Sequence, residues 1–262
     1  MLNDKFNRIH PSAQLGANVT VESFTTIYEN VEIGENTWIG PNVVIFPDTK
    51  IGKNCTIYPG AVLGAVSQDL KYKGEKASVE IGDNTVIREC VTIHKATADK
   101  LVTRVGDHCL LMAYTHVAHD VQIGNHCIIA NGAGIAGHVE IGDYVTIEGM
   151  VGIQQFVKIG DYAFIGACSN LRKDVPPFIR ASRTKEEFCV FIGVNTIGLK
   201  RRGFADTAIQ QIEQMYKILY IHNKNFSLGQ EEIEKNITDS IYKQQILDFI
   251  RNAKSGIVKG II

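Results

Sequence analysis

The sequence predicts a parallel β-solenoid followed by a smaller α-helical C-terminal domain, so that most of the chain is all-β. Three observations support this prediction. Aliphatic residues recur every six positions, small or β-branched residues recur four positions after each of them, and apolar residues beyond position 200 recur at helical spacing instead. We expect the solenoid over residues 1–190 and the α-helical domain over residues 191–262.

The six-residue repeat is nearly continuous. It runs from Ile9 to Leu63 without a miss, resumes in phase at Ile81, and ends at Leu171. Because side chains alternate along a strand, the aliphatic residue and the small residue two positions before the next one point to the same side. Three repeats, about 18 residues, therefore close one triangular coil, and successive coils stack in parallel.

Two insertions interrupt the repeat, at residues 69–80 and 99–104. Both are multiples of six residues long, so the phase continues after each, and both leave the prism at the same corner. Loops on one side of a solenoid often mark the face that binds ligands, although surface loops also vary in length without a function. This corner is therefore the first candidate for chemistry.

Pro176 and Pro177 end the repeat, because proline lacks the N–H that a strand ladder needs. Apolar residues at helical spacing follow between positions 209 and 219. Ser227 with Gln230 predicts a capping box at the start of a further helix. Helices at this end would protect the open last coil of the solenoid.

Composition excludes several classes of protein. With 27 Lys and Arg against 28 Asp and Glu, the chain is not a nucleic-acid binder that depends on bulk positive charge. No signal peptide and no apolar run of about 18 residues is evident, so we expect a cytoplasmic protein with no transmembrane segment. The 6 cysteines include no CxxC pair, and we interpret them as small, buried, reduced packing residues.

The corner with the two insertions carries histidine beside a carboxylate, at His119 and Asp120. A carboxylate that supports a histidine suits a general base. One coil later the same positions hold Gly137 and His138, and one coil beyond them Gln155, with Gln154 beside it. A backbone N–H at Gly137 would suit an oxyanion, as acyl transfer requires, whereas glycine there could also serve only the turn.

Two alternatives to an acyl-transfer enzyme remain open from the residues alone. His116, His119, His126 and His138 lie close in sequence, and one hexapeptide-repeat family that resembles carbonic anhydrases binds zinc through three histidines. With the three faces labelled A, B and C in chain order, coil arithmetic places His126 on face B and His116 at the end of a hexad of face C, so we predict no metal site. A non-catalytic solenoid that uses its faces for assembly is the other alternative.

Two charged segments are candidate binding sites. The first insertion contains Asp69, Lys71, Tyr72 and Lys73, which could bind phosphates or sugar hydroxyls, and Lys200–Arg202 forms a positive patch that suits a diphosphate or an acidic protein. Both are also compatible with ordinary solvated surface charge.

The repeat resembles the left-handed parallel β-helix of the hexapeptide-repeat acyltransferases, and longer segments are similar to one group in that family, the UDP-N-acetylglucosamine O-acyltransferases of lipid A synthesis. The similar segments are QDLKYKGE at 68–75, THVAHD at 115–120, AGHVEIGD at 136–143, DVPPF at 174–178 and GVNTIGLKRRGF at 193–204. The resemblance spans nearly the full chain, and the left hand of the coil is inferred from it.

The resemblance implies an enzyme that transfers an (R)-3-hydroxyacyl chain from acyl carrier protein to the 3-hydroxyl of UDP-N-acetylglucosamine, as a cytoplasmic homotrimer with sites between subunits. It implies that His119 is the general base, that Asp120 orients it, and that the Gly137 N–H stabilises the oxyanion of a direct attack without an acyl-enzyme. The donor is held on the phosphopantetheine of the carrier protein, which would meet basic C-terminal residues, and neither a cofactor nor a metal is implied.

The resemblance also implies binding roles. The residues that match the family's sugar-nucleotide and acyl contacts, some from a neighbouring subunit, are Gln68, Asp69, Lys71, His116, His138, Gln155, Asn195, Arg201 and Arg202. Ala167 aligns with the family's hydrocarbon ruler, and its small side chain suggests a long acyl chain. Gln154 and Ile197 depart from the family's usual histidine and glutamate. Some relatives acylate a 3-amino sugar instead, so an ester and an amide product both remain open.

Overall fold

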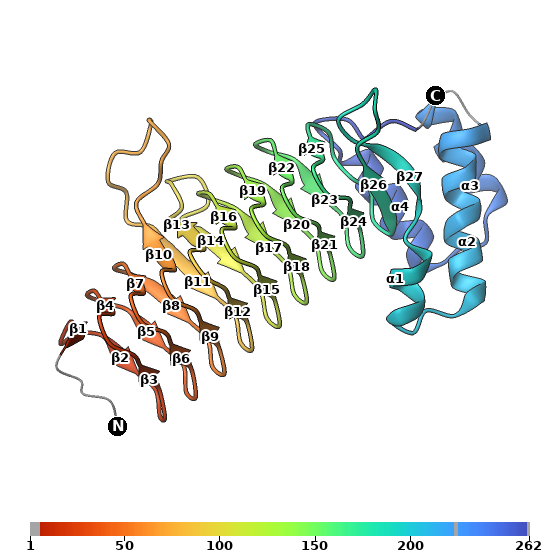
Figure 1. Ribbon diagram of the computed structural model, residues 1–262. Helices are drawn as coiled ribbons and strands as arrows, with labels where there is room; N and C mark the ends of the chain where they lie inside the picture. Colours follow the sequence, from red (N-terminus) through yellow and green to blue (C-terminus); the bar gives the residue numbers. More distant parts are fainter. Residues whose placement is uncertain (1–5, 223–224, 261–262) are drawn as a thin grey trace.

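The computed structural model describes residues 6–222 and 225–260 as a three-sided prism of short parallel strands, capped at one end by helices (Figure 1). Each of the three faces is one hydrogen-bonded sheet, and up to β25 every third strand belongs to the same face, after which β26 and β27 extend the third sheet. We name the faces A, B and C in chain order, and the A–B, B–C and C–A corners are the turns between them.

The strands follow the six-residue repeat. Face A consists of β1 (Arg8–Ile9), β4 (Thr26–Ile27), β7 (Val44–Ile45), β10 (Val62–Ala65), β13 (Thr92–His94), β16 (His116–Val117), β19 (Gly134–Ile135), β22 (Gly152–Ile153) and β25 (Asn170–Leu171). Face B consists of β2 (Gln14–Leu15), β5 (Glu32–Ile33), β8 (Thr49–Ile51), β11 (Ser78–Ile81), β14 (Val102–Val105), β17 (Gln122–Ile123), β20 (Glu140–Ile141) and β23 (Lys158–Ile159). Face C consists of β3 (Thr20–Val21), β6 (Trp38–Ile39), β9 (Thr56–Ile57), β12 (Val86–Ile87), β15 (Leu110–Leu111), β18 (Ile128–Ile129), β21 (Thr146–Ile147), β24 (Phe164–Ile165), β26 (Ile179–Ser182) and β27 (Val190–Val194).

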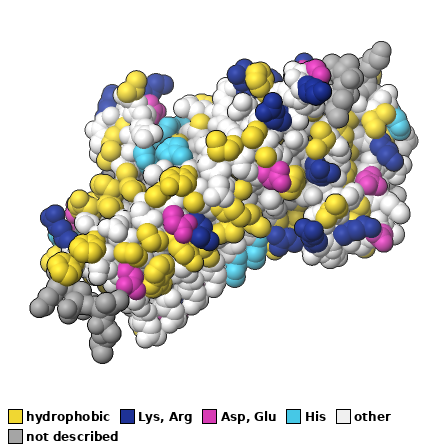
Figure 2. Space-filling view, viewed as in Figure 1, with side chains coloured by type: hydrophobic (Ala, Val, Ile, Leu, Met, Phe, Trp, Pro, Cys, Tyr) yellow, Lys and Arg dark blue, Asp and Glu magenta, His cyan; other side chains and the backbone are white. Residues whose placement is uncertain are grey.

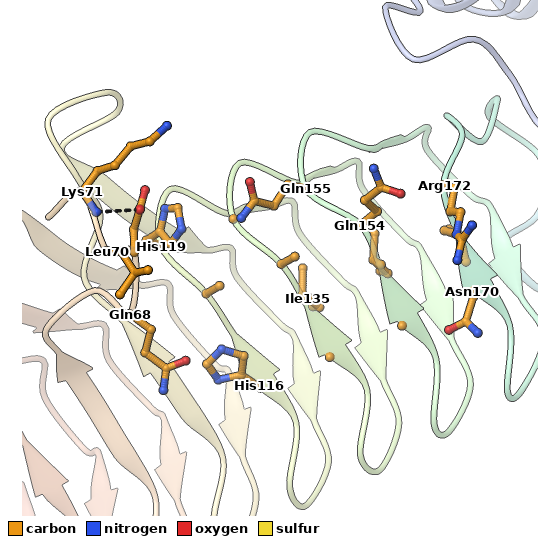
Figure 3. Close-up of a pocket in the computed structure, with 18 residues that line it drawn as sticks. Gln68, Leu70, Lys71, His116, His119, Ile135, Gln154, Gln155, Asn170 and Arg172 are labelled. Carbon is orange, nitrogen blue, oxygen red and sulfur yellow. Dashed lines mark hydrogen bonds between the residues drawn. The ribbon is translucent and has the colours of Figure 1, made fainter.

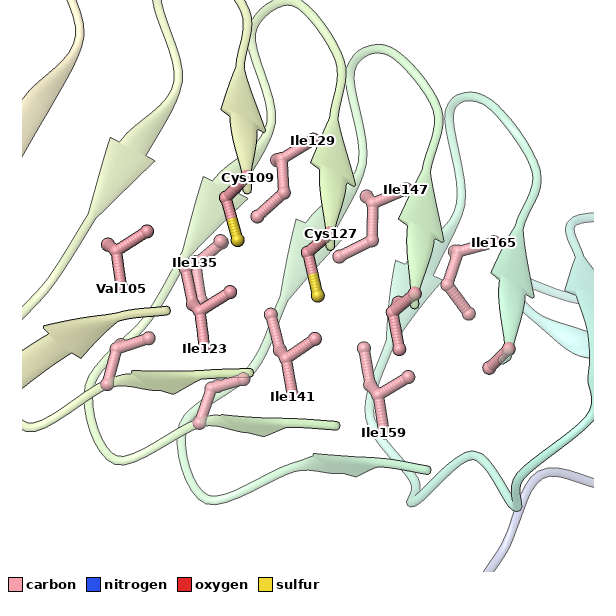
Figure 4. Packing of buried hydrophobic residues seen from close by; sticks show 14 of the residues in the cluster. Val105, Cys109, Ile123, Cys127, Ile129, Ile135, Ile141, Ile147, Ile159 and Ile165 are labelled. Carbon is pink, nitrogen blue, oxygen red and sulfur yellow. The ribbon is translucent and has the colours of Figure 1, made fainter. Parts of the chain in front are cut away.

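The repeated aliphatic residues fill the inside of the prism, as predicted (Figure 4). Ile57, Ile93 and Ile129 have no exposed surface, and each such side chain contributes about 1.5–3 kcal/mol on burial. The prediction that all cysteines are buried is wrong. Cys55, Cys109 and Cys127 are buried, but Cys90 and Cys168 are exposed and Cys189 is half-buried. Cys90 and Cys168 lie at turn positions of the C–A corner, where side chains point outward.

The corners use the left-handed backbone region at one position per turn, which asparagine and aspartate tolerate better than other non-glycine residues. Asn36 and Asn54 occupy it at ordinary B–C turns. At the A–B corner the same conformation is adopted by Asp120 and His138, with φ of +61° and +62°. Uncommon backbone of this kind is often found where a side chain must be aimed.

Both loops leave the A–B corner, as predicted, and one of them rises clear of the prism in Figure 1. They occupy residues 66–77, between β10 and β11, and residues 95–101, between β13 and β14. Each loop therefore begins and ends earlier than the insertions at 69–80 and 99–104. The last residues of each insertion form ladder hydrogen bonds within β11 and β14 instead.

The C-terminal region begins with a strand rather than a helix. β27 returns antiparallel to β26 and crosses the expected boundary at residue 190. The helices are α1 (Thr196–Arg201), α2 (Asp206–Lys217), a π-helical turn η2 (Ile218–His222), α3 (Phe226–Asn236) and α4 (Ile241–Arg251). In the described part of the chain, no helix has the length and apolar character needed to cross a membrane.

The predicted capping box at Ser227 and Gln230 is wrong. Asn225 caps α3, and its side chain accepts a hydrogen bond of 2.8 Å from the Ser227 N–H. The helices pack on the last coils through aromatic side chains. Phe191 stacks on Tyr220 with 4.1 Å between ring centroids, and the buried Tyr216 hydroxyl donates to the Pro177 carbonyl.

Candidate active site

A groove of about 880 Å³ lies along face A beside the A–B corner. It brings together seven of the predicted site residues: Gln68, Asp69, Lys71, His116, His119, Gly137 and Gln155. Figure 3 shows that the loop residues Gln68 and Lys71 lie near His119 at one end, while Asn170 and Arg172 lie at the other. The first loop therefore borders the groove, as its departure from this corner predicts.

His119 and Asp120 contact each other although they are adjacent in sequence. His119 Nδ1 lies 2.9 Å from Asp120 Oδ2, and the side chains are 6% and 0% exposed. An ionised carboxylate only accepts hydrogen bonds, so the hydrogen of the neutral ring belongs on Nδ1. Nε2 is then an unprotonated nitrogen at the groove, which is the arrangement that a general base needs.

The second loop fixes Asp120. The Thr97 N–H and hydroxyl and the Lys100 N–H all donate to its carboxylate, over 2.7 to 3.1 Å. Burial acts to raise the pKa of Asp120, but the hydrogen bonds from His119, Thr97 and Lys100 outweigh it and hold this pKa below its usual value. Asp120 is therefore an anion at neutral pH that cannot rotate away from His119.

Gly137 is required by close packing rather than by the turn, since its φ is not left-handed. A Cβ at this position would lie 2.4 Å from His119 Cε1, closer than real Cβ atoms approach. Within residues 6–222 and 225–260 the Gly137 N–H donates to no acceptor. The glycine thus lets the imidazole lie against the backbone and leaves a free N–H at the groove.

Two further histidines adjoin this pair. His138 stacks on Phe156 at 4.5 Å, and its Nε2 lies 3.9 Å from Asp120 Oδ2. Its Nδ1 is 3.0 Å from the exposed Asp99 carboxylate, though not in the direction of a hydrogen bond. His116 pairs through Nδ1 with the Thr92 hydroxyl at 2.7 Å, and burial lowers its pKa.

One metal-compatible group exists among the described residues. His119, Asp120 and His138 each offer one ligand atom, and these atoms lie within 4.8 Å of one another. Asp120 Oδ2 already accepts hydrogen bonds from His119 and Thr97, and His138 Nε2 lies beyond hydrogen-bond distance of it, at 3.9 Å. His126, which the zinc hypothesis included, lies at the B–C corner, stacked between His108 and Tyr144.

The chain matches two family models and several relatives of known name. A family model described as "Udp N-acetylglucosamine O-acyltransferase; Domain 2" matches residues 174–258, and a bacterial hexapeptide-transferase model matches residues 30–65, 103–137 and 138–173. An acyl-[acyl-carrier-protein]–UDP-N-acetylglucosamine O-acyltransferase from Sulfurihydrogenibium is 55% identical over 95% of this chain and 93% of its own length. The chain belongs to the UDP-N-acetylglucosamine O-acyltransferase family.

Solved structures support the same assignment. A UDP-N-acetylglucosamine acyltransferase from Bacteroides fragilis superposes with a TM-score of 0.95 at 42% identity, covering 98% of this chain and all of that one. The Francisella novicida enzyme gives a TM-score of 0.94 at 36% identity, over 97% and 93% of the two chains. The fold of this acyltransferase is thus the left-handed parallel β-helix with a helical C-terminus that the sequence predicts.

Four predicted site residues of the acyltransferase lie away from the groove. Asn195 caps α1 and donates to the Tyr162 carbonyl, and the Arg202 guanidinium lies 4.7 Å above the Tyr144 ring, both at the B–C corner. Arg201 is the last residue of α1, and Arg202 comes directly after it. Ala167, at the C–A corner, donates its N–H to Glu148. A single chain does not bring these residues to His119.

The placement of His116 on face C, which followed from coil arithmetic, is wrong. His116 belongs to β16 on face A and pairs with Thr92 and Gly134. The physical reason is that each strand begins one residue before its inward aliphatic residue, here Val117. The side chain at that position points outward, into the groove.

Four residues at or beside the groove are not among those that the sequence predicts: His94, Thr97, Lys100 and Arg172. His94 is buried, and its ring lies 5.0 Å from that of His116. Burial, followed by the nearby His116 and His119, lowers the pKa of His94 to about 4. Its position at the last residue of β13, where the second loop begins, is the signal that could have revealed it. Thr97 and Lys100 act mainly through backbone N–H groups, which residue identity does not reveal.

Proposed function

We propose that this acyltransferase moves an (R)-3-hydroxyacyl chain from acyl carrier protein to the 3-hydroxyl of UDP-N-acetylglucosamine, the first step of lipid A synthesis. The observation that supports it most is the His119–Asp120 pair at the groove, beside the free N–H of Gly137. The curated relatives are named for this reaction. We expect it to take place in the cytoplasm, with acyl carrier protein as the protein partner.

In the proposed mechanism His119 Nε2 removes the proton of the sugar hydroxyl as its oxygen attacks the thioester carbonyl. Asp120 stabilises the imidazolium that forms. The Gly137 N–H donates to the oxyanion of the tetrahedral intermediate. The intermediate collapses by breaking the C–S bond, and His119 returns the proton to the leaving thiolate.

Direct attack without an acyl-enzyme fits the groove. In the described chain, the residues that line it include no serine, threonine or cysteine, and these are the usual acyl-accepting nucleophiles. We propose that the phosphopantetheine of the carrier protein is the only prosthetic group needed. His138, Gln68, Asp69, Lys71, His116 and Gln155 are then binding residues for the sugar nucleotide and the acyl group.

We propose that the enzyme is a homotrimer, and the unequal faces support this. The outward positions of face C are largely apolar in its middle, at Val86, Leu110, Ile128 and Phe164. On face B the outward positions form ion pairs along the prism, between Lys50 and Glu32, Arg104 and Glu80, and Lys158 and Glu140. Face C is therefore suited to contact a second copy and face B to contact water.

Such an assembly would bring Asn195, Arg201, Arg202 and Ala167 of one copy to the groove of its neighbour. In this arrangement Arg201 and Arg202 bind the diphosphate, and Ala167 limits the acyl chain. Size-exclusion chromatography with light scattering tests the assembly directly, since a monomeric active enzyme would contradict it.

The function is tested by incubating the wild-type enzyme with UDP-N-acetylglucosamine or its 3-amino analogue and a series of (R)-3-hydroxyacyl carrier proteins. Products are identified by mass spectrometry. We expect an ester on the acetamido sugar, with the largest kcat/KM for a long chain. Transfer to the 3-amino analogue alone would contradict the proposed acceptor, and absence of product with every pair would contradict the function.

A further inference from the structure

The second loop, residues 95–101, is anchored at both ends by lysine side chains. At its start Lys95 is buried, and its ammonium lies 3.3 Å from Asp48 Oδ2. At its other end the Lys100 ammonium lies 2.8 Å from Glu140 Oε1. Ion pairs thus hold both ends of the loop to the prism.

Glu140 differs from the other glutamates that form ion pairs on face B. In the described chain Glu32 and Glu80 each pair with one cation, on a neighbouring strand. Glu140 pairs with two, the Lys100 ammonium of the loop and the Lys158 ammonium of β23, each at 2.8 Å. Burial acts to raise the pKa of Glu140, but its interactions with the two lysines outweigh burial and hold this pKa below its usual value. Glu140 is therefore an anion fixed between the loop and the next coil.

Lys158 is itself held in place by a buried carboxylate. Its backbone N–H donates to Asp174 Oδ1 over 2.8 Å, and Asp174 is 1% exposed. Its backbone carbonyl accepts from the Val175 N–H, also over 2.8 Å. A side chain that starts from a fixed backbone loses less freedom when it forms an ion pair. The contact with Lys158 therefore helps to keep the Glu140 carboxylate in place for Lys100.

The loop residue that Glu140 holds also contacts the carboxylate of the candidate site. The Lys100 N–H donates to Asp120 Oδ1 over 3.0 Å, while the ammonium of the same residue bonds to Glu140. Neither Lys100 nor Glu140 is among the described residues that line the groove. An effect of Glu140 on the reaction must therefore pass through the loop and Asp120.

We propose that Glu140 is a positioning residue for the acyl transfer. By binding the Lys100 ammonium it keeps the Lys100 N–H directed at Asp120, and it thereby keeps Asp120 aligned with His119. Because a hydrogen bond weakens steeply when its angle is lost, a small movement of the loop end is enough to disturb this alignment. The inference rests on the proposed function, since it concerns the general base of that reaction.

The test removes each partner of this ion pair and compares the result with an ion pair of the same face that contacts neither loop. Glu140→Leu removes the carboxylate, and Lys100→Met removes the ammonium but keeps the backbone N–H. The double variant combines both changes. Glu32→Leu is the matched control, because Glu32 pairs with Lys50 at 3.0 Å, from one strand to the next. Circular dichroism and melting temperature establish that each variant folds.

In the acyl-transfer assay we expect kcat to fall about 3- to 10-fold in Glu140→Leu and in Lys100→Met, the size of effect that a partly exposed ion pair can supply. KM for the sugar nucleotide and for acyl carrier protein should stay within about 2-fold of wild type, since neither residue lines the groove. The double variant should lose no more than either single variant, because both changes break one contact. Lys100→Arg should recover most of the loss, and Glu32→Leu should match wild type.

Hydrogen exchange, followed by nuclear magnetic resonance, reports on the loop itself. The Lys100 N–H is bonded to Asp120 in the wild-type enzyme. We expect it to exchange about 10-fold faster in Glu140→Leu and in Lys100→Met, because the loop end opens more often. Its rate should be unchanged in Glu32→Leu.

A wild-type kcat in a folded Glu140→Leu enzyme would overturn the proposal. So would a lowered kcat with the Lys100 N–H still exchanging at the wild-type rate, or losses that multiply in the double variant. Absence of acyl transfer by the wild-type enzyme would contradict the proposed function instead. The exchange rates would then still decide whether Glu140 holds the Lys100 N–H on Asp120.

Discussion

Two corners of the prism contain histidine, and they differ in everything around it. Figure 2 shows histidine in separate places on the molecule, one of them beneath the projecting loop. At the B–C corner His108 and His126 stack in parallel at 4.7 Å, and the stack continues through Tyr144 and Tyr162. At the A–B corner His119 stands against Gly137 and bonds to a buried carboxylate. Histidine at a corner is thus not sufficient for a site.

What distinguishes the A–B corner is its two loops. Residues 95–101 bring the N–H groups of Thr97 and Lys100 to Asp120, and residues 66–77 border the groove. The B–C corner has no insertion, so each coil simply repeats the turn above it. The six-residue repeat forms the prism, and the two loops that interrupt it complete the candidate site.

Among the residues that surround His119, the largest expected effect is for Asp120→Asn. An amide cannot accept from His119 Nδ1–H and from the Thr97 and Lys100 N–H groups at once, so the imidazole loses its fixed tautomer. We expect kcat to fall by two to four orders of magnitude. Asp107→Asn is the matched control, because Asp107 accepts a backbone N–H at the B–C corner. Equal losses of kcat in Asp120→Asn and Asp107→Asn would contradict a special role for the A–B corner.

A smaller but still large effect is expected for Gly137→Ala. The added Cβ would lie 2.4 Å from His119 Cε1 and displace the ring, so we expect about a 100-fold loss of kcat with little change in melting temperature. Gly149→Ala is the control at the same position of a C–A turn, where a Cβ would lie 3.4 Å from Asn131 O. Unchanged activity in Gly137→Ala would contradict the required close approach.

Thr97→Val tests the contribution of the second loop alone. It removes the 2.7 Å hydroxyl bond to Asp120 but keeps the backbone N–H. We expect a loss of kcat of about 3- to 10-fold, from one lost charge-assisted hydrogen bond. Thr97→Ser should restore most of the activity, and a serine variant as defective as valine would argue for packing rather than hydrogen bonding.

The smallest effect concerns stability against acid. The pKa of His94 is about 4 in the folded chain, whereas an unfolded histidine titrates near 6.5. Between these values the unfolded state binds more protons, so the free energy of unfolding should decrease as pH falls from 6.5 to 4. In His94→Asn this decrease should be smaller, as urea melts at several pH values would show. An equal decrease in wild type and in His94→Asn would contradict this prediction.

Much of the fold follows from the sequence because one short repeat fixes it. The inward position of every hexad and the corner that holds both loops are direct consequences of a six-residue period and phase. The sequence determines the first and last residues of each helix less well. Ser227 has a capping sequence around it, but Asn225 is nearer the actual start of α3 and caps it better.

The candidate site was predictable where it depends on coil register and not where it depends on loops. Counting 18 residues relates His119 to Gly137 and Asp120 to His138. No such count reaches Thr97 or Lys100, because an irregular loop determines where their backbone points. Asn195 and Arg202 could not be placed either, since the return of β27 carries them to the B–C corner.

The most direct test of the account is to compare His119→Gln with His126→Gln in the acyl-transfer assay. Glutamine keeps the size and polarity of histidine but cannot act as a base. We predict that His119→Gln loses at least three orders of magnitude in kcat while His126→Gln stays within about 3-fold of wild type. Comparable activity in a correctly folded His119→Gln enzyme would contradict the assignment of His119 as the general base.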